Sequence, residues 1–86
     1  MSYRLTIIPR ATKDLEELEG KLFDQVTAAI RSLADNPRPP GSLKLSDEES
    51  GYRVRVRDMR ILYRVDDGGK EVVVYRVKHR REAYRR

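Results

Sequence analysis

Apolar and charged residues alternate along residues 52–57, which read Tyr-Arg-Val-Arg-Val-Arg. Successive side chains of a β-strand point to opposite faces, so this pattern predicts a strand. Tyr52, Val54 and Val56 would share one face and the three arginines would share the other. This stretch is the strongest structural signal in the chain, and the remaining elements are expected to be arranged around it.

A second strand is predicted from Arg60 to Val65, and Asp58 and Met59 fit the turn between the two strands, although the Asn-Gly or Asp-Gly pair of a tight hairpin is absent. Antiparallel pairing of these strands would give one apolar, buried face. The opposite face would gather Arg53 and Arg55, with Arg60 and Arg64 as further candidates. Because like charges placed side by side are unfavourable, we expect such a face to bind an anion.

The N-terminal half follows a strand–helix–helix pattern. Alternation in residues 3–7 predicts a first strand, which Pro9 ends because proline has no N–H to donate. Apolar positions then recur with helical spacing in residues 11–18 and again in residues 22–33, with Gly20 between them. Neither helix has histidines or cysteines at metal-ligand spacing, so both apolar stripes are interpreted as core.

The second half contributes the rest of the sheet. The second helix should stop at Asn36-Pro37, and residues 38–41 continue as an extended connector. Leu43 and Leu45 flank Lys44 in a short strand or at the edge of the sheet, and the acidic residues 47–49 fit a solvated loop. A turn at residues 66–69 precedes a last strand at residues 71–78, in which Val73, Tyr75 and Val77 are expected to share one face.

These elements predict an α+β fold with the order β-α-α-β-β-β. Two N-terminal helices would pack on one face of a mostly antiparallel four-stranded sheet, and a short basic tail would follow. At 86 residues the chain fits a single domain, spanning residues 1–86. No segment is long and apolar enough to span a membrane, and the first residues do not resemble a signal peptide, so a cytoplasmic location is expected.

Positive charge is concentrated in the second part of the chain. Residues 1–51 contain seven Lys/Arg against nine Asp/Glu, whereas residues 52–86 contain twelve against five, and the whole chain has a net charge of +5. This asymmetry favours a polyanionic partner, of which a phosphate backbone is the commonest. A basic surface that serves only solubility explains the charge equally well.

The chemistry available to this surface is narrow. The chain has one histidine, no cysteine and no carboxylates at convincing ligand spacing, so we expect no metal and no cofactor. What remains is a set of cations with a tyrosine: Lys44, Arg53, Arg55, Arg60, Lys78, Arg80, Arg81 and Tyr84. Such a set suits metal-free phosphoryl transfer on RNA, with Tyr84 or His79 moving the proton because arginine is a poor proton donor. A phosphate-binding surface without chemistry fits the same residues.

The stretch YRVRVRDMRILYRV resembles the core motif of the RelE/ParE superfamily, the small toxins of toxin–antitoxin pairs. The resemblance extends over nearly the whole chain, through YRLTIIPRATKDLEEL, SLADNPRPPG, the Lys44-Leu45 pair and the closing VKHRREAYRR. It implies the strand and helix order given above. RelE-type members cleave messenger RNA in the ribosomal A site by 2′-hydroxyl attack without metal, whereas ParE-type members poison DNA gyrase.

The resemblance also assigns roles to particular residues. The positions that match the family's catalytic residues are Arg53, Arg55, Arg60, Arg80 and Tyr84. Further RNA contacts are expected from Lys44, Arg57, Lys78, His79 and Arg81. Arg81 is an alternative to Arg80, and His79 is an alternative proton-transfer group. The family turn usually reads Gly-Asp-Tyr before the arginine, and this chain has Arg57-Asp58-Met59 there.

The resulting hypothesis is a RelE-type, ribosome-dependent endoribonuclease toxin. Its expected partners are a RelB-like antitoxin, the A site of the 30S ribosomal subunit and messenger RNA. The main alternative is a ParE-like toxin that binds and poisons DNA gyrase without nuclease activity. A DNA-binding module is a weaker alternative, since no helix is both basic and exposed in the manner of a recognition helix.

Overall fold

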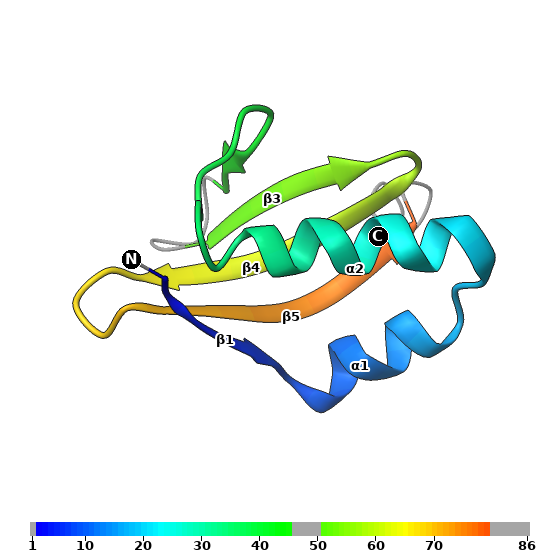
Figure 1. The fold of residues 1–86 in the computed structure, drawn as a ribbon, viewed down its shortest axis with the longest axis horizontal. Helices are drawn as coiled ribbons and strands as arrows, with labels where there is room; N and C mark the ends of the chain where they lie inside the picture. The colour runs from blue at the N-terminus through cyan, green and yellow to red at the C-terminus, as the bar shows by residue number, and fades with distance from the viewer. Residues whose placement is uncertain (1, 46–50, 80–86) are drawn as a thin grey trace.

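The computed structural model describes residues 2–45 and 51–79, and within them the chain forms a sheet with two helices on one side (Figure 1). The elements follow one another as β1 (Arg4–Ile7), α1 (Pro9–Glu16), α2 (Gly20–Ser32), β2 (Leu43–Lys44), β3 (Gly51–Val56), β4 (Met59–Asp66) and β5 (Glu71–His79). The α+β class expected from the sequence is confirmed, and the predicted order holds except for one added strand, β2.

The sheet has five strands in the order β1-β5-β4-β3-β2. β1 pairs with β5 in parallel, and every other pairing is antiparallel. The sequence predicted four strands and left residues 43–45 open between a short strand and the sheet edge. In the structure, residues 43–44 form a fifth strand, β2, which pairs with β3 through Leu43–Arg53 and Lys44–Tyr52.

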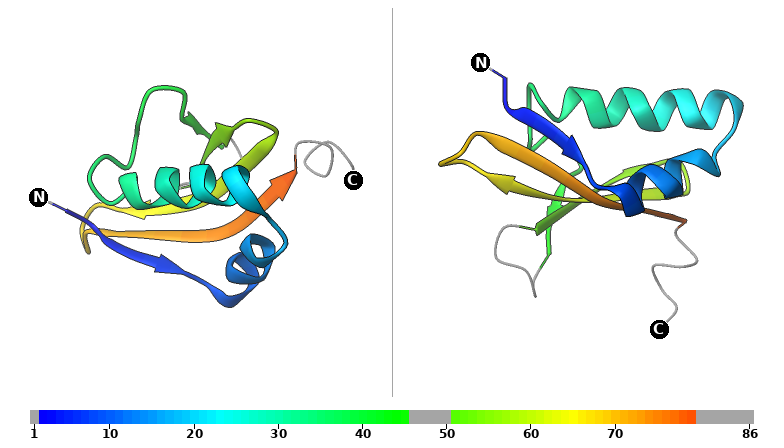
Figure 2. Two further views of the ribbon diagram at one scale, coloured as in Figure 1. Left: turned by 45° about the vertical axis from the view of Figure 1, so that its right-hand side comes forward. Right: turned by 90° about the horizontal axis from the view of Figure 1, so that it is seen from below.

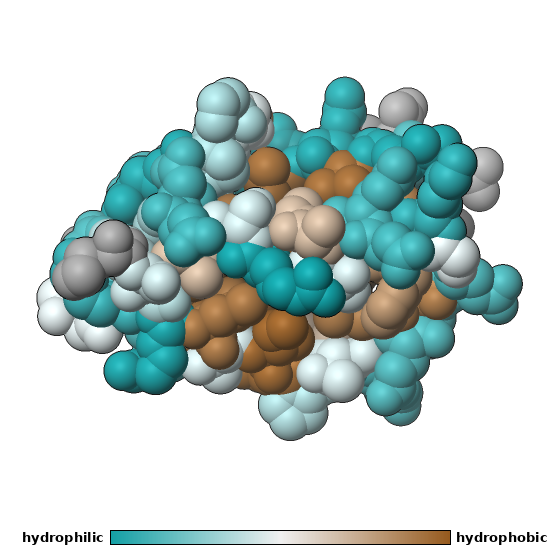
Figure 3. Space-filling model, in the orientation of Figure 1, coloured by the Kyte–Doolittle hydropathy of each residue, from teal (hydrophilic) through white to brown (hydrophobic). Residues whose placement is uncertain are grey.

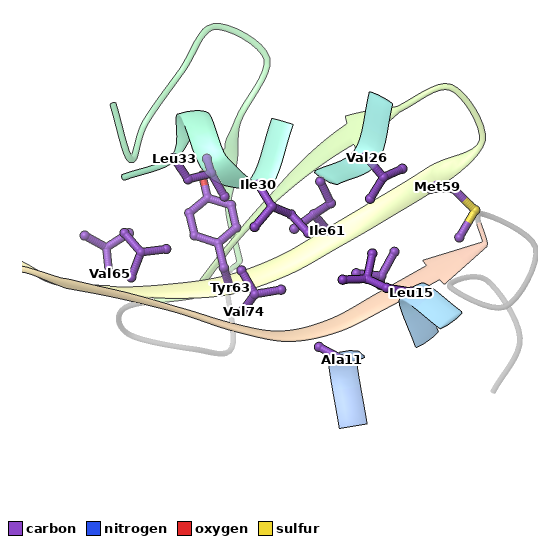
Figure 4. Packing of buried hydrophobic residues seen from close by; sticks show 12 residues of the cluster. Ala11, Leu15, Val26, Ile30, Leu33, Met59, Ile61, Tyr63, Val65 and Val74 are labelled. Carbon is purple, nitrogen blue, oxygen red and sulfur yellow. The ribbon is translucent and has the colours of Figure 1, made fainter. Parts of the chain in front are cut away.

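The two helices cover the sheet unequally (Figure 2). α2 lies across one face, here called the inner face, and α1 packs against β5 close to the end of β1. Ile30 of α2 and Leu33, which directly follows α2, point towards Tyr63 and Ile61 of β4 (Figure 4), and all four side chains are at most 1% exposed. Each fully buried side chain of this size contributes roughly 1.5–3 kcal/mol, so this contact is a major source of stability.

The hairpin between β3 and β4 is shifted by one residue from the sequence prediction. Its turn consists of Arg57 and Asp58, because Met59 already pairs with Val56 as the first residue of β4 and is 5% exposed. Arg57 occupies a left-handed conformation with φ of 55°. That conformation is strained for a residue with a side chain, and glycine adopts it freely.

The face assignment predicted for the last strand is wrong in part. β4 and β5 change register between Leu62 and Tyr63, which pair with Arg76 and Val74, so Tyr75 is the extra residue of a β-bulge. The buried positions of β5 are therefore Val72, Val74 and Val77, and not the continuous alternation Val73, Tyr75, Val77. A bulge of this kind breaks the two-residue alternation, and here it leaves two residues, Tyr75 and Arg76, between the buried Val74 and Val77.

Asp14 of α1 holds the free edge of β5 where β1 no longer pairs. The backbone N–H of Val77 donates to Asp14 Oδ2 at 2.9 Å, and Arg76 Nε donates to the same oxygen at 2.8 Å. Burial acts to raise the pKa of Asp14, but these two hydrogen bonds outweigh it, and the pKa lies below its usual value. The ionised carboxylate thus replaces a missing strand partner.

We predict that Asp14→Asn lowers the free energy of unfolding by about 1–2 kcal/mol at pH 7, because a charge-assisted contact becomes neutral. The native pKa is lowered, so the carboxylate stabilises the fold above its usual pKa of 3.8, and this stabilisation is lost as the pH falls through the native value. Urea unfolding as a function of pH should show the two proteins converging in acid. Glu16→Gln on the exposed side of α1 is the control, and an equal loss in both variants would contradict the role of Asp14.

We also predict that Arg57→Gly raises the free energy of unfolding by about 0.5–1 kcal/mol, since relief of the left-handed strain exceeds the extra freedom of glycine in the unfolded chain. Arg57→Ala is the matched variant, because it removes the same charge and keeps the strain. Chemical denaturation of the three proteins measures the difference. Equal stability of the Gly and Ala variants would show that the turn is unstrained.

Candidate nucleic-acid interface

Cations of three neighbouring strands lie side by side on the sheet face that points away from the helices, here called the outer face. Arg55 of β3 pairs with Arg60 of β4, and Arg60 pairs with Lys78 of β5. Residues directly opposite each other in a sheet point to the same side at about 5 Å. The register therefore forms a transverse row of three positive charges, and Arg53 occupies the next outward position of β3.

Three of the predicted catalytic arginines line one open pocket of about 480 Å³. Arg53 and Arg55 come from β3 and Arg60 comes from β4, the connector before β2 supplies Pro40 and Gly41, and β2 supplies Leu43. Arg60 is only 7% exposed, whereas Arg55 is exposed. A guanidinium fixed in the wall loses little conformational freedom when an anion binds, and its planar fork matches the oxygens of a phosphate.

The connector is held against the sheet by Arg38. Arg38 Nε donates to the hydroxyl of Tyr52 at 2.9 Å, and its terminal nitrogens donate to both carboxylate oxygens of Asp67 at 2.9 and 3.3 Å. Asp67 also accepts a hydrogen bond from the Tyr3 hydroxyl at 2.7 Å. The Arg38 and Tyr3 contacts hold the pKa of Asp67 below its usual value, so the clamp stays ionised near neutral pH.

A second contact fixes the same connector from inside the core. The hydroxyl of Tyr63 donates to the carbonyl oxygen of Pro37 at 2.7 Å, and the Tyr63 ring stacks on Tyr52 with centroids 5.8 Å apart. Burial raises the pKa of Tyr63 to about 12, so the hydroxyl remains protonated and continues to donate. These contacts place the rim of the pocket, a role that the sequence alone did not assign to Arg38 or Pro37.

Other residues expected at the site lie elsewhere. Lys44 pairs with Tyr52, and its ammonium lies 5.8 Å from the Tyr52 ring, which places it on the inner side of the sheet. His79 pairs with Met59 on the same inner side and lines a separate pocket of about 410 Å³ next to Asp14. Arg57 lies in the hairpin turn.

The predicted positions near the C-terminus, Arg80, Arg81 and Tyr84, lie outside the described residues. Within residues 2–45 and 51–79, no three side chains of His, Asp or Glu come together as metal ligands would. The helices of the same segments are all too short or too polar to cross a bilayer.

Residues 5–84 match the family model described as the ParE toxin of type II toxin–antitoxin systems, parDE. The chain belongs to this toxin family. Toxin RelG of Mycobacterium tuberculosis is 31% identical to it over 87 aligned residues, which cover 100% of both proteins. The resemblance to the RelE/ParE superfamily and its RelE-type branch, noted from the sequence, is thereby confirmed.

Solved structures of RelE toxins share the fold. The toxin–antitoxin complex RelBE2 of Mycobacterium tuberculosis contains a chain with a TM-score of 0.80 and 28% identity, over 93% of this chain and 100% of that one. The archaeal RelE–RelB complex of Pyrococcus horikoshii gives a TM-score of 0.82 and 26% identity, over 93% and 97% of the two chains. Two helices on a mixed sheet with this connectivity are therefore the architecture of RelE-like toxins.

For the interface, we predict that Arg55→Ala weakens binding of a non-cleavable single-stranded RNA more than Lys44→Ala does. Both substitutions remove one positive charge, but only Arg55 lies in the outer-face row. The slope of log affinity against log salt should fall by about one for Arg55→Ala, as expected when one phosphate contact is lost. Fluorescence anisotropy at several salt concentrations measures the RNA affinity and its salt dependence. Equal losses of affinity in the two variants would show that the RNA does not bind specifically to the outer-face row.

Proposed function

We propose that this toxin is a ribosome-dependent messenger RNA endonuclease that cleaves its substrate in the A site without a metal ion. The observation that supports this most is the pocket lined by Arg53, Arg55 and Arg60, because it gathers three arginines from two adjacent strands. A group of this kind matches the oxygens of a phosphodiester, and its strand-built wall is rigid before substrate arrives.

The chemistry follows from the substrate's own nucleophile. The 2′-hydroxyl gives up its proton to water and attacks the adjacent phosphorus, so that a bond from O2′ to phosphorus forms while the bond from phosphorus to the 5′-oxygen breaks. The 5′-oxygen gains one proton in exchange, and the products are a 2′,3′-cyclic phosphate and a 5′-hydroxyl. Negative charge grows on the equatorial phosphate oxygens in the transition state, and positive side chains already fixed in place stabilise it without reorganisation. Arg60 is the best placed for this, since its position in the pocket wall is the most buried.

A proton must reach the leaving 5′-oxygen, and the described tyrosines and histidine do not line the arginine pocket. His79 lies on the inner side next to Met59, and the Tyr63 hydroxyl is engaged by Pro37. From the family resemblance we propose that Tyr84 transfers this proton, with Arg80 as an additional phosphate contact and Arg81 as its alternative.

The arginine pocket is open, so it cannot hold a free RNA in the geometry needed for cleavage, and this explains why the ribosome would be required. The described part of the pocket is bounded by strands on one side and by the connector at its rim, so a flexible RNA is not held in line for attack. A message already fixed in the A site meets that requirement, because its conformation is set before the toxin arrives.

The test is cleavage of a message on programmed ribosomes by the purified protein. We predict cuts at the A site, poor cleavage of naked RNA, and a loss of about 10²–10³ in rate for Arg60→Ala. Arg31→Ala, which removes a charge from the exposed side of α2, is the control and should cleave like the wild type. Circular dichroism checks that each variant folds.

A specific alternative comes from the name of the matching family model, which is that of ParE toxins. If the protein leaves messages intact on ribosomes and instead blocks DNA supercoiling by gyrase, the endonuclease proposal fails and the gyrase poison replaces it.

We further propose that an antitoxin neutralises the toxin by docking on the inner side. The neighbours of known structure include RelE chains bound to RelB. In this protein apolar side chains gather beneath α2, over β1 and β5 (Figure 3), and Leu5 and Ile7 of β1 are only partly buried. A segment that folds on binding can cover such a surface with its own apolar side chains.

Co-expression with the product of the neighbouring reading frame should yield a complex that survives high salt in gel filtration, since apolar contacts supply most of its affinity. Association should nevertheless slow as salt rises, because opposite charges steer the encounter. A complex that dissociates in moderate salt would show that charge pairing alone holds the two proteins together.

A further inference from the structure

A stacked arginine–tyrosine pair lies on the outer face beyond the arginine pocket. Arg64 of β4 places its guanidinium carbon 4.5 Å from the centroid of the Tyr75 ring of β5. Arg64 is exposed and Tyr75 is partly exposed. The established family membership and the proposed cleavage site assign no role to either residue.

The pair lies at the bulge in β5. Tyr75 is the extra residue between the pairs Tyr63–Val74 and Leu62–Arg76, and it follows the buried Val74. Arg64 occupies the outward position of β4 after Leu62, and its guanidinium lies over the Tyr75 ring of the neighbouring strand. Both side chains therefore belong to the outer face.

The pair lies in line with the arginine pocket. Arg60, Leu62 and Arg64 are successive outward positions of β4, so Arg64 lies about 13 Å from Arg60 along the strand. Arg53 pairs with Leu62 between them. The next outward position is Asp66, which pairs with Glu71, and Glu71 in turn forms an ion pair with Arg4 of β1 at 3.7 Å.

We propose that Arg64 and Tyr75 form a subsite for an unpaired base of single-stranded RNA. This deepens the proposed function, on which it rests: a strand whose phosphate occupies the arginine pocket would lay a neighbouring base against the Arg64 guanidinium, which the Tyr75 ring supports. Bases of unpaired RNA stack on guanidinium planes and on aromatic rings, and cation–π attraction keeps the two protein groups together.

The test uses a fluorescein-labelled oligoadenylate decamer that is 2′-O-methylated to block cleavage, and an otherwise identical decamer without bases. Binding to the protein is followed by anisotropy. Tyr75→Leu should weaken binding of the decamer with bases by about five- to 100-fold, the range for loss of one stacked base. Its affinity for the decamer without bases should stay within twofold of the wild type, because the phosphates remain.

Two further variants separate stacking from other effects. Tyr75→Phe keeps the ring and should bind like the wild type, whereas Arg64→Lys keeps the charge, loses the planar group and should weaken binding in the same base-dependent way. Arg64→Lys also provides the test if Tyr75→Leu does not fold, as judged by circular dichroism. The subsite is refuted if both folded variants bind the decamer with bases normally, or if they lose the same affinity for both decamers.

These outcomes are independent of the endonuclease proposal. A base-dependent loss in Tyr75→Leu supports the subsite even if the wild type fails to cut messages on ribosomes. Conversely, cleavage on ribosomes with unchanged decamer binding by Tyr75→Leu and Arg64→Lys refutes the subsite alone.

Discussion

The two-residue alternation of β4 determines where almost every feature of the outer face lies. β4 is central in the sheet, and Ile61 and Tyr63 are buried beneath α2. A slip of one residue in its pairing would exchange these side chains with Arg60 and Leu62, burying charge and exposing the core. The positions of the outward arginines are therefore enforced by the burial of apolar groups on the other side of the same strand.

This constraint explains how the protein tolerates cations in adjacent positions. Arg55, Arg60 and Lys78 form a transverse row, an arrangement that disfavours the folded state when the partner anion is absent. The apolar contacts under α2 are strong enough to hold the register against that repulsion. A site that is electrostatically unfavourable when empty gains more on binding a phosphate, because the anion removes the repulsion as well as forming its own contacts.

The sequence predicted secondary structure correctly where apolar residues recurred with a single period. It failed where local backbone geometry determined the position of a turn or a bulge. Alternation in residues 52–57 correctly predicted the faces of β3, and helical periodicity predicted both helices. The turn was misplaced by one residue, since a turn at Arg57-Asp58 requires a positive φ at arginine that residue preferences do not favour. The bulge at Tyr75 has no sequence signature, so the buried set of β5 could not be read from its valines.

The site was predictable to a similar extent. Arg53, Arg55 and Arg60 were identified from their strands, and the structure brings them to one pocket. Lys44 was grouped with them by charge, but its pairing with Tyr52 turns it to the inner side. Which face a two-residue strand presents depends on its register with its neighbour, and nothing within Leu43 and Lys44 themselves specifies that register.

The wall and the rim of the pocket depend on different kinds of support. The wall belongs to paired strands, whereas the rim at Pro40 and Gly41 belongs to a connector without regular structure. Arg38 joins the rim to Tyr52 of β3 and to Asp67 of the β4–β5 turn, while Tyr63 holds Pro37 from the core. The contacts that fix the connector thus begin on the inner side and define a pocket that opens on the outer side. In this protein the rim of the arginine pocket therefore depends on packing and hydrogen bonds that no bound RNA would touch.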